Sequence, residues 1–293
     1  MNAPRTILIF VDGLGLGLDD PAINPIHSGC CPVLERLLKE ESVPVDARLG
    51  VKGLPQSATG QAALLTGVNA PAAVGRHVEG LPGPELRKIV QAHNLFLKLK
   101  ERGYRSTFAN AYHTDDVEEV RGRRRQSVTT VASLAAFGGV RKTGDMLVNR
   151  AVYQDLSREF LRSRGYDGPL VSPRESAAHL LAIAADHDFT LFEYFQTDLM
   201  AHKGTPDDVR RVLSRLDEFL EGLLAWPNEP GHLLLLTSDH GNIEDSRTKV
   251  HTENPVPLVA VGEGAEVMKA GVKSLTYFVP TLLELYPQKK LET

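Results

Sequence analysis

Three short segments in the C-terminal half carry aspartate and histidine at spacings that suit a metal site. They are Asp198-x-x-x-His202, the adjacent pair Asp239-His240, and His251. Imidazole and carboxylate together bind borderline or hard divalent ions such as Zn²⁺, Mn²⁺ and Fe²⁺. One catalytic ion keeps a coordination position open, so five protein ligands exceed its needs. The pattern predicts one site with two ions about 3.5–4 Å apart, the arrangement that moves phosphoryl groups.

Each of these segments adjoins a stretch with the composition of a buried strand. Residues 189–195 and 232–238 lead into the first two segments, and the apolar run 255–261 follows the third. In an open α/β sheet, ligands bind beyond the carboxyl ends of the strands. For any single segment the alternative is structural, with Asp-His-Gly as a turn and His202 as a helix cap.

Two residues in the N-terminal half could complete the site. Asp12 follows the apolar run 6–11, which has the pattern of a strand buried on both faces. Ser57 stands where a loop gives way to a short helix, and backbone N–H groups at a helix N-terminus stabilise anions. Taken alone, Asp12 could be a turn residue and Ser57 a helix cap. Next to two metal ions, Ser57 becomes a candidate nucleophile, with Thr59 as the second choice.

Composition narrows the class of partner. The 293 residues are 42% hydrophobic and 24% charged, with a formal net charge of −4, as in an ordinary soluble globular protein. This charge gives no argument for nucleic-acid binding, and the apolar runs are too short to span a membrane. The two cysteines, Cys30 and Cys31, are neighbours, which makes a disulfide framework improbable. We expect a cytoplasmic protein with a small anionic substrate, and the oligomeric state is left open.

Alternation of strand and helix patterns predicts an α/β fold, with a mostly parallel central sheet flanked by helices and a small inserted cap. The predicted core comprises residues 1–112 and 172–293, and the predicted cap comprises residues 113–171. The expected strands are 6–11, 104–112, 189–195, 232–238 and 256–261, and the expected helices are 31–41, 60–67, 86–103, 172–187, 205–225 and 275–286.

The predicted cap is rich in arginine, and its guanidinium groups could bind a phosphorylated substrate. The candidates for this role are Arg121, Arg124 and Arg141, with Arg123, Arg125 and Arg150 as further possibilities. The alternative for the run 121–125 is a solvated loop.

The order of the motifs resembles the alkaline-phosphatase superfamily, in particular the metalloenzyme branch of cofactor-independent phosphoglycerate mutase and phosphopentomutase. The matching segments are Asp12, Ser57-Ala-Thr-Gly60, Asp198-Leu-Met-Ala-His202, Asp239-His240-Gly241-Asn242 and His251-Thr-Glu-Asn254-Pro255-Val-Pro257. One departure is Gln61, which stands where the mutases have histidine. A second departure is the short middle segment, since the mutases carry a larger second domain.

The resemblance implies one metal ion held by Asp198, His202 and His251. It implies a second ion held by Asp12, Asp239 and His240, with Ser57 as nucleophile and adjoining ligand. It favours Mn²⁺, and the ligand set also suits Zn²⁺. Together with the small cap, it predicts a two-metal phosphoester hydrolase with a phosphoserine intermediate. The alternatives are a phosphomutase with a reduced cap, a sulfatase or phosphodiesterase, and a metal-binding module without turnover.

Overall fold

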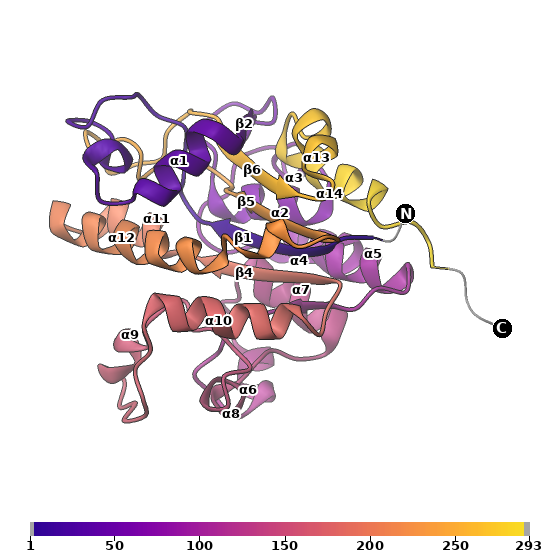
Figure 1. The fold of residues 1–293 in the computed structure, drawn as a ribbon. Helices are drawn as coiled ribbons and strands as arrows, with labels where there is room; N and C mark the ends of the chain where they lie inside the picture. The colour runs from indigo at the N-terminus through magenta and orange to yellow at the C-terminus, as the bar shows by residue number, and fades with distance from the viewer. Residues whose placement is uncertain (1–2, 290–293) are drawn as a thin grey trace.

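A six-stranded sheet forms the centre of the computed structural model, which describes residues 3–289 (Figure 1). Across the sheet the strands follow the order β2-β6-β5-β1-β4-β3. β1 pairs in parallel with β4 and β5, and β3 with β4, whereas β6 is antiparallel to both β5 and β2. The prediction of an α/β fold with a mostly parallel sheet is confirmed. The strands are β1 Arg5–Val11, β2 Ser42–Val45, β3 Ser106–Phe108, β4 Phe189–Tyr194, β5 His232–Thr237 and β6 Val256–Gly262.

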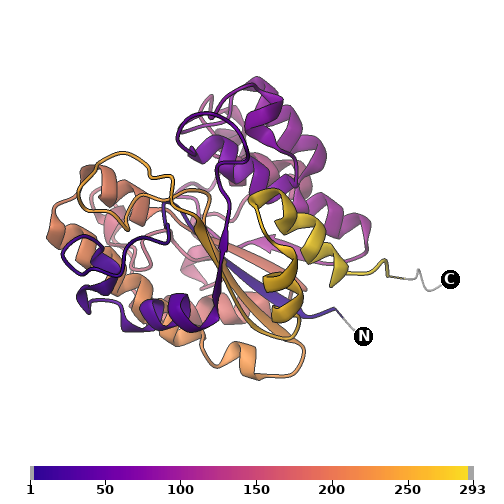
Figure 2. The same ribbon diagram turned by 90° about the horizontal axis from the view of Figure 1, so that it is seen from above.

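Helices cover both faces of this sheet (Figure 2). One face packs against α2, α4, α5, α7, α13 and α14, and the other against α1, α10 and α12. Within β1, Leu8 and Phe10 belong to the first core, and Ile7, Ile9 and Val11 to the second. The helices are α1 Pro32–Glu41, α2 Ser57–Thr66, α3 Ala70–Ala73, α4 Pro84–His93, α5 Leu95–Glu101, α6 Val117–Gly122, α7 Val128–Phe137, α8 Thr143–Leu147, α9 Glu159–Arg162, α10 Pro173–Ala184, α11 Gln196–Lys203, α12 Pro206–Leu223, α13 Ala265–Gly271 and α14 Leu275–Glu284, with 3-10 turns at Pro25–Ser28 and Trp226–Asn228.

Local signals in the sequence explain where the long helices begin. Ser172 and Thr205 cap α10 and α12, each accepting a hydrogen bond from the backbone N–H three residues on. In α10 the Glu175 side chain accepts in return from the Ser172 N–H, which completes a capping box. Proline follows both caps at a position where its missing N–H costs nothing.

Two local predictions were wrong in detail, and one strand was not predicted. The helix expected over 86–103 is broken at Asn94, which is extended and uses its side chain to cap α5. The strand expected over 104–112 is only Ser106–Phe108. The edge strand Ser42–Val45 was missed because Pro44 argues against a strand in the middle of a sheet; at an edge, proline is tolerated.

The middle segment 113–171 is not uniform. Helix α7 contributes Val128, Val131 and Ala132 to the main core. A separate small apolar cluster contains Met146, Tyr153 and other side chains from further along the segment. The division into a core and a cap at residues 113 and 171 stays a prediction, and any cap must leave α7 with the core.

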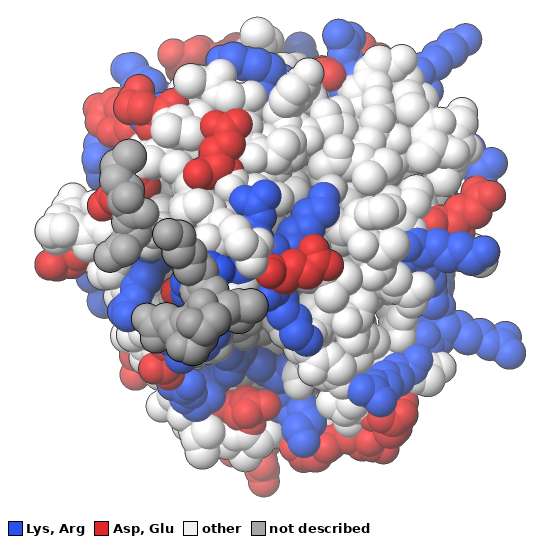
Figure 3. All heavy atoms as spheres, turned by 90° about the vertical axis from the view of Figure 1, so that its right-hand side faces the viewer, with Lys and Arg blue, Asp and Glu red and all other residues white. Residues whose placement is uncertain are grey.

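Charges of both signs share the face shown in Figure 3, where Lys and Arg lie among Asp and Glu and broad uncharged areas. Among the described residues, none of the helices combines the length and apolar character needed to cross a membrane. The cytoplasmic location stays a prediction.

Candidate metal centre

The topology of the sheet brings the predicted ligands to one edge. Asp12 follows β1, Asp239 and His240 follow β5, and Asp198 lies on α11, which begins directly after β4. Because β1, β4 and β5 are parallel, their carboxyl ends share this edge. Strand β6 is antiparallel to β5, so His251, which precedes β6, comes to the same edge. The antiparallel strand therefore explains why one ligand stands before its strand while the others stand after theirs.

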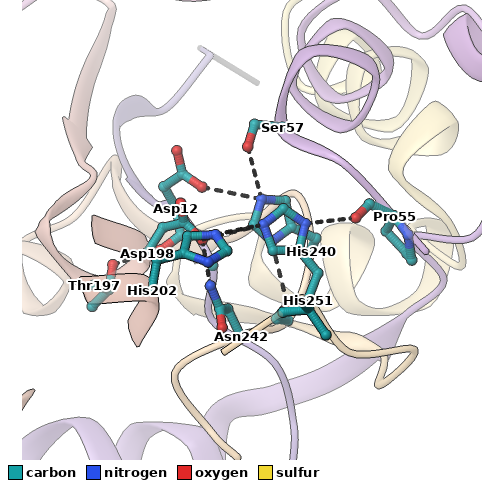
Figure 4. A network of polar contacts seen from close by, with 12 residues as sticks. Asp12, Pro55, Ser57, Thr197, Asp198, His202, His240, Asn242 and His251 are labelled. Atoms are coloured by element: carbon teal, nitrogen blue, oxygen red, sulfur yellow. Dashed lines mark hydrogen bonds and ion pairs between the residues drawn. The ribbon is translucent and has the colours of Figure 1, made fainter. Parts of the chain in front are cut away.

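Asp198, His202 and His251 form the first ligand group (Figure 4). The Nε2 atoms of the two histidines lie 3.0 Å apart. The Oδ1 atom of Asp198 lies 3.3 Å from His202 Nε2 and 3.5 Å from His251 Nε2. Three ligand atoms from two segments thus converge on one point.

The hydrogen bonds behind these two histidines fix which nitrogen faces the centre. His251 Nδ1 donates to the Pro55 carbonyl oxygen at 2.8 Å, and His202 Nδ1 to the Lys249 carbonyl oxygen at 2.7 Å. With Nδ1 used as the donor, it is Nε2 of each ring that faces the centre, and the two Nε2 atoms lie close enough together to bind one cation. Backbone carbonyls commonly orient metal-binding histidines in this way.

Asp12, Asp239 and His240 form the second group. The Nε2 atom of His240 lies 3.3 Å from Asp12 Oδ1 and 3.6 Å from Asp239 Oδ2. All three residues are buried, and Asp239 and His240 have no exposed surface. The His240 ring stacks on that of His251 with centroids 3.7 Å apart, so the two groups adjoin.

Buried carboxylate oxygens of the second group fit a cation. Asp12 Oδ1 and Asp239 Oδ2 are buried and accept no hydrogen bond within the described part of the chain. Burial, reinforced by the neighbouring carboxylates, raises the pKa of Asp12 to about 7 and that of Asp239 to about 6. Burial alone would lower the pKa of His240, but Asp239 and Asp12 outweigh it and raise that pKa to about 10. A divalent ion would relieve this concentration of negative charge.

Ser57 begins α2, and its hydroxyl points into the centre (Figure 4). Its Oγ lies 3.0 Å from His240 Nε2. Gly60, one turn into the helix, lies against Asp239, where an added Cβ would come within 2.7 Å of the Asp239 carbonyl oxygen. The second candidate nucleophile, Thr59, instead donates to Gln56 O and accepts from Val78 N–H. Of the two hydroxyls, that of Ser57 contacts the ligand groups.

Glu244 supports the centre and was missed in the sequence. Its Oε2 accepts from the N–H groups of Gly15 and Asn242 at 2.9 and 2.7 Å. Its Oε1 accepts from the Thr252 hydroxyl and, at 3.0 Å, from the Asn254 side-chain amide. One fully buried carboxylate thus ties together the loop after β1, the turn after β5 and the segment before β6.

Two amides orient carboxylates of the candidate ligand groups. Asn242 Nδ2 donates to Asp198 Oδ1 at 2.7 Å, and Gln61 Nε2 donates to Asp12 Oδ2 at 3.2 Å. Gln61 is the position where the sequence departs from the mutases, and here its amide holds Asp12. Packing also explains why the third residue of Asp-His-Gly-Asn is glycine. A Cβ at Gly241 would overlap the side chains of Glu244 and Thr252.

The predicted substrate arginines lie in different places. Arg124 and Arg125 line a cleft of about 700 Å³ that also reaches Ser57 and His251. Arg121 pairs with Glu118 and also donates to the Gly138 carbonyl. Arg141 donates to the Arg150 carbonyl and the Thr107 hydroxyl, and neither Arg121 nor Arg141 lines this cleft. Arg150 pairs with Asp186 at 2.8 Å. Arg123 lines a second cleft, described next.

The second cleft, of about 610 Å³, opens from Asp12, Ser57 and Asp198 toward the middle segment. Its walls carry several aromatic side chains, and a buried carboxyl, that of Glu193, faces it. Burial raises the pKa of Glu193 to about 7, and its Oε2 accepts from the Thr129 hydroxyl at 2.6 Å.

Comparisons with known proteins agree with the predicted resemblance. The model of the Metalloenzyme superfamily matches residues 4–286. The 2,3-bisphosphoglycerate-independent phosphoglycerate mutase of Vibrio parahaemolyticus is 33% identical over 126 residues, which cover 40% of this chain and 24% of the mutase. The mutase of the same name from Mycoplasmopsis synoviae is 31% identical over 124 residues, with the same shares. The matched region thus spans about a quarter of these relatives.

Solved structures show the same fold at low identity. The alkaline phosphatase of Thermus thermophilus superposes with a TM-score of 0.62 at 16% identity, covering 99% of this chain and 92% of that one. The alkaline phosphatase of the Antarctic bacterium TAB5 gives a TM-score of 0.54 at 12% identity, covering 99% and 100%. The fold is therefore that of the alkaline phosphatases.

Proposed function

Because the chain belongs to the Metalloenzyme superfamily, we propose that it is a phosphoester hydrolase that uses two divalent metal ions and Ser57. The observation that carries this proposal is the position of Ser57 Oγ, 3.0 Å from His240 Nε2 at the N-terminus of α2. A nucleophilic oxygen there meets both the ligand groups and the N-terminal dipole of a helix, which favours a phosphate. The substrate is a small phosphorylated molecule.

The proposed ligands fall into the two groups described above. Asp198, His202 and His251 would hold one ion, and the group with Asp12, next to Ser57, would hold the other. When bound, the ions supply positive charge that neutralises phosphate oxygens and lowers the pKa of a neighbouring hydroxyl. The nitrogen and oxygen donors suit Mn²⁺, which we propose, and also Zn²⁺.

Two displacements at phosphorus make up the proposed reaction. In the first, a bond forms between Ser57 Oγ and phosphorus while the phosphorus–oxygen bond to the alcohol breaks. The serine loses its proton and the departing alcohol gains one. In the second, water adds to phosphorus and the bond to Oγ breaks, which restores the serine and releases inorganic phosphate. Throughout, Gln61 and Asn242 hold the carboxylates of Asp12 and Asp198 in place.

Hydrolysis is preferred over mutase chemistry because a mutase must retain its substrate between the two steps. Within the predicted cap, residues 113–171, helix α7 packs in the core, so little chain is left that could close over a bound substrate. A phosphomutase is the second candidate, favoured by the local similarity to the Vibrio mutase.

The test is metal analysis followed by a screen of phosphomonoesters in the presence of Mn²⁺ or Zn²⁺. The proposal expects about two ions per chain and release of inorganic phosphate. Isomerisation of phosphoglycerates or pentose phosphates without phosphate release would instead identify a mutase. Metal-loaded protein that binds the esters and turns none over would be a binding module.

A further inference from the structure

We propose that the 610 Å³ cleft beside the metal centre binds the alcohol portion of the ester, and that this portion is apolar and bears a ring. The preferred substrates are then aryl or arylalkyl phosphomonoesters rather than phosphates of small polyols or hydroxy acids. This inference rests on the proposed function and adds the substrate class.

The cleft is continuous with the reacting atoms. Asp12, Ser57 and Asp198 all line it, so the nucleophile and a carboxylate from each ligand group form its inner end. With the phosphoryl group at Ser57, an ester body that extends from phosphorus has this cleft open to it. A volume of about 610 Å³ lies in the range of pockets that enclose most of a small ligand.

Several aromatic side chains stand among the polar residues of the walls. Phe108, Tyr112, Tyr153, Phe160 and Phe195 all line the cleft. Tyr153 is buried, whereas Phe160 leaves 41% of its surface exposed, although it is a large apolar side chain. A ring bound in the cleft would stack on such side chains and take apolar surface out of water. These five side chains therefore offer contact to an apolar guest.

Outside the two ligand groups, the charged side chains that line the cleft are Glu193, Arg123, Arg164 and Lys203, and Lys203 is exposed. Glu193 is buried and faces the cleft, so a substrate carboxylate would meet another acidic side chain there. The amide of Asn110, which also lines the cleft, is already used on the backbone of Glu193, donating to its carbonyl and accepting from its N–H. Arg123 pairs with Glu119 at 2.6 Å, and the Arg164 guanidinium lies 4.8 Å from the Phe160 ring centre.

Three further cations, Arg87, Arg124 and Arg125, line the other cleft, of about 700 Å³, which also reaches Ser57. These cations suit the approach of the phosphate itself. A substrate whose body carried a further anion would extend into that cleft, and its preference would be the opposite of the one proposed here.

The test compares esters with similar leaving-group oxygens, so that reactivity does not obscure binding. The esters are phenylpropyl phosphate, propyl phosphate and glycerol phosphate. The proposal expects kcat/KM about ten- to a hundredfold higher for the phenylpropyl ester than for the propyl ester, because a buried ring adds apolar area. Glycerol phosphate should be the poorest substrate. Equal values for the three esters, or the highest value for glycerol phosphate, would overturn the inference while the hydrolase proposal stands.

A variant locates the preference in the cleft. Phe160→Ala should lower the phenylpropyl-to-propyl ratio several-fold, mainly through KM. Tyr277→Ala is the matched control, because Tyr277 is 55% exposed on α14 and does not line the cleft. A ratio unchanged by Phe160→Ala would overturn the assignment of the ring to this cleft.

A binding measurement tests the cleft assignment independently of the proposed hydrolysis. Metal-loaded Ser57→Ala protein should bind phenylpropyl phosphonate at least about tenfold more tightly than propyl phosphonate, by calorimetry. If no ester is hydrolysed but this difference is found, the hydrolase proposal fails and the cleft assignment holds. Equal affinities would reject the cleft assignment.

Discussion

The metal centre and the wall of the adjoining cleft are built differently, although both lie at the same edge of the sheet. The centre takes its residues from the ends of β1 and β5, from α2 and α11 and from the segment before β6, and Asp239 and His240 have no exposed surface. The wall takes Tyr153 and Phe160 from a segment with short helices, and Phe160 is 41% exposed. Rigid elements suit a reaction that needs fixed geometry, and loops suit the recognition of a particular molecule. The difference suggests that the centre determines the reaction and the wall determines the substrate.

Ser57→Ala should have the largest effect, and it should abolish hydrolysis of all substrates alike. Without the nucleophile, we expect kcat to fall by roughly 10³-fold or more for every ester that the protein hydrolyses. The metal content should stay near two per chain. The exposed Ser28, which bonds the Pro25 carbonyl, supplies the control Ser28→Ala. If kcat fell for some esters only, Ser57 would contribute to substrate recognition and would not be the nucleophile.

Asp239→Asn should remove one ion rather than one substrate. The substitution takes away the charge of a fully buried carboxylate beside Asp12 and His240. We expect about one ion per chain by elemental analysis and kcat at least about 100-fold lower. Asp245→Asn is the control, since Asp245 pairs with Arg247 outside both ligand groups. Two ions in the Asp239→Asn protein would contradict the assigned ligands.

Glu244→Gln tests whether metal binding depends on the hydrogen bonds that Glu244 accepts. A glutamine amide cannot accept all four hydrogen bonds that the carboxylate accepts, so one pair of donors loses its partner. We expect about 10- to 100-fold weaker metal binding and a loss of about 1–3 kcal/mol in the free energy of unfolding. The control is Glu253→Gln, whose side chain is 62% exposed. The ratio of kcat/KM between different esters should not change. A changed ratio would contradict the separate roles of the metal centre and the cleft wall.

A change of pH alone, without any substitution, should also change metal binding. Asp239 and Asp12 raise the pKa of His240 to about 10 despite its burial, so the metal-free imidazole is protonated near neutral pH. A metal ion needs the neutral ring and must displace that proton. Apparent affinity should therefore rise about tenfold per pH unit between about pH 7 and about pH 9, and more steeply below about pH 7, where Asp12 is protonated as well. A pH-independent affinity by calorimetry would show that His240 is not a ligand.

The sequence reveals the centre better than the wall for a physical reason. Asp12, Asp239 and His240 stand directly at the ends of apolar strands, so local pattern alone predicts where they meet. Glu244 could not be found in this way, because its donors come from three segments that approach one another only in the folded chain. The wall depends on the path of residues 113–171, where strand and helix patterns are weak. Asn94 is a different case, since its capping preference was a local signal for the break between α4 and α5.

The stereochemical course at phosphorus tests the central claim, attack by Ser57, most directly. A phosphorothioate monoester made chiral with oxygen isotopes would be hydrolysed in isotopically labelled water, and the configuration of the released thiophosphate determined. Two successive displacements, through Ser57 and then through water, predict overall retention of configuration. Inversion would mean that water attacks phosphorus directly, and it would contradict a phosphoserine intermediate.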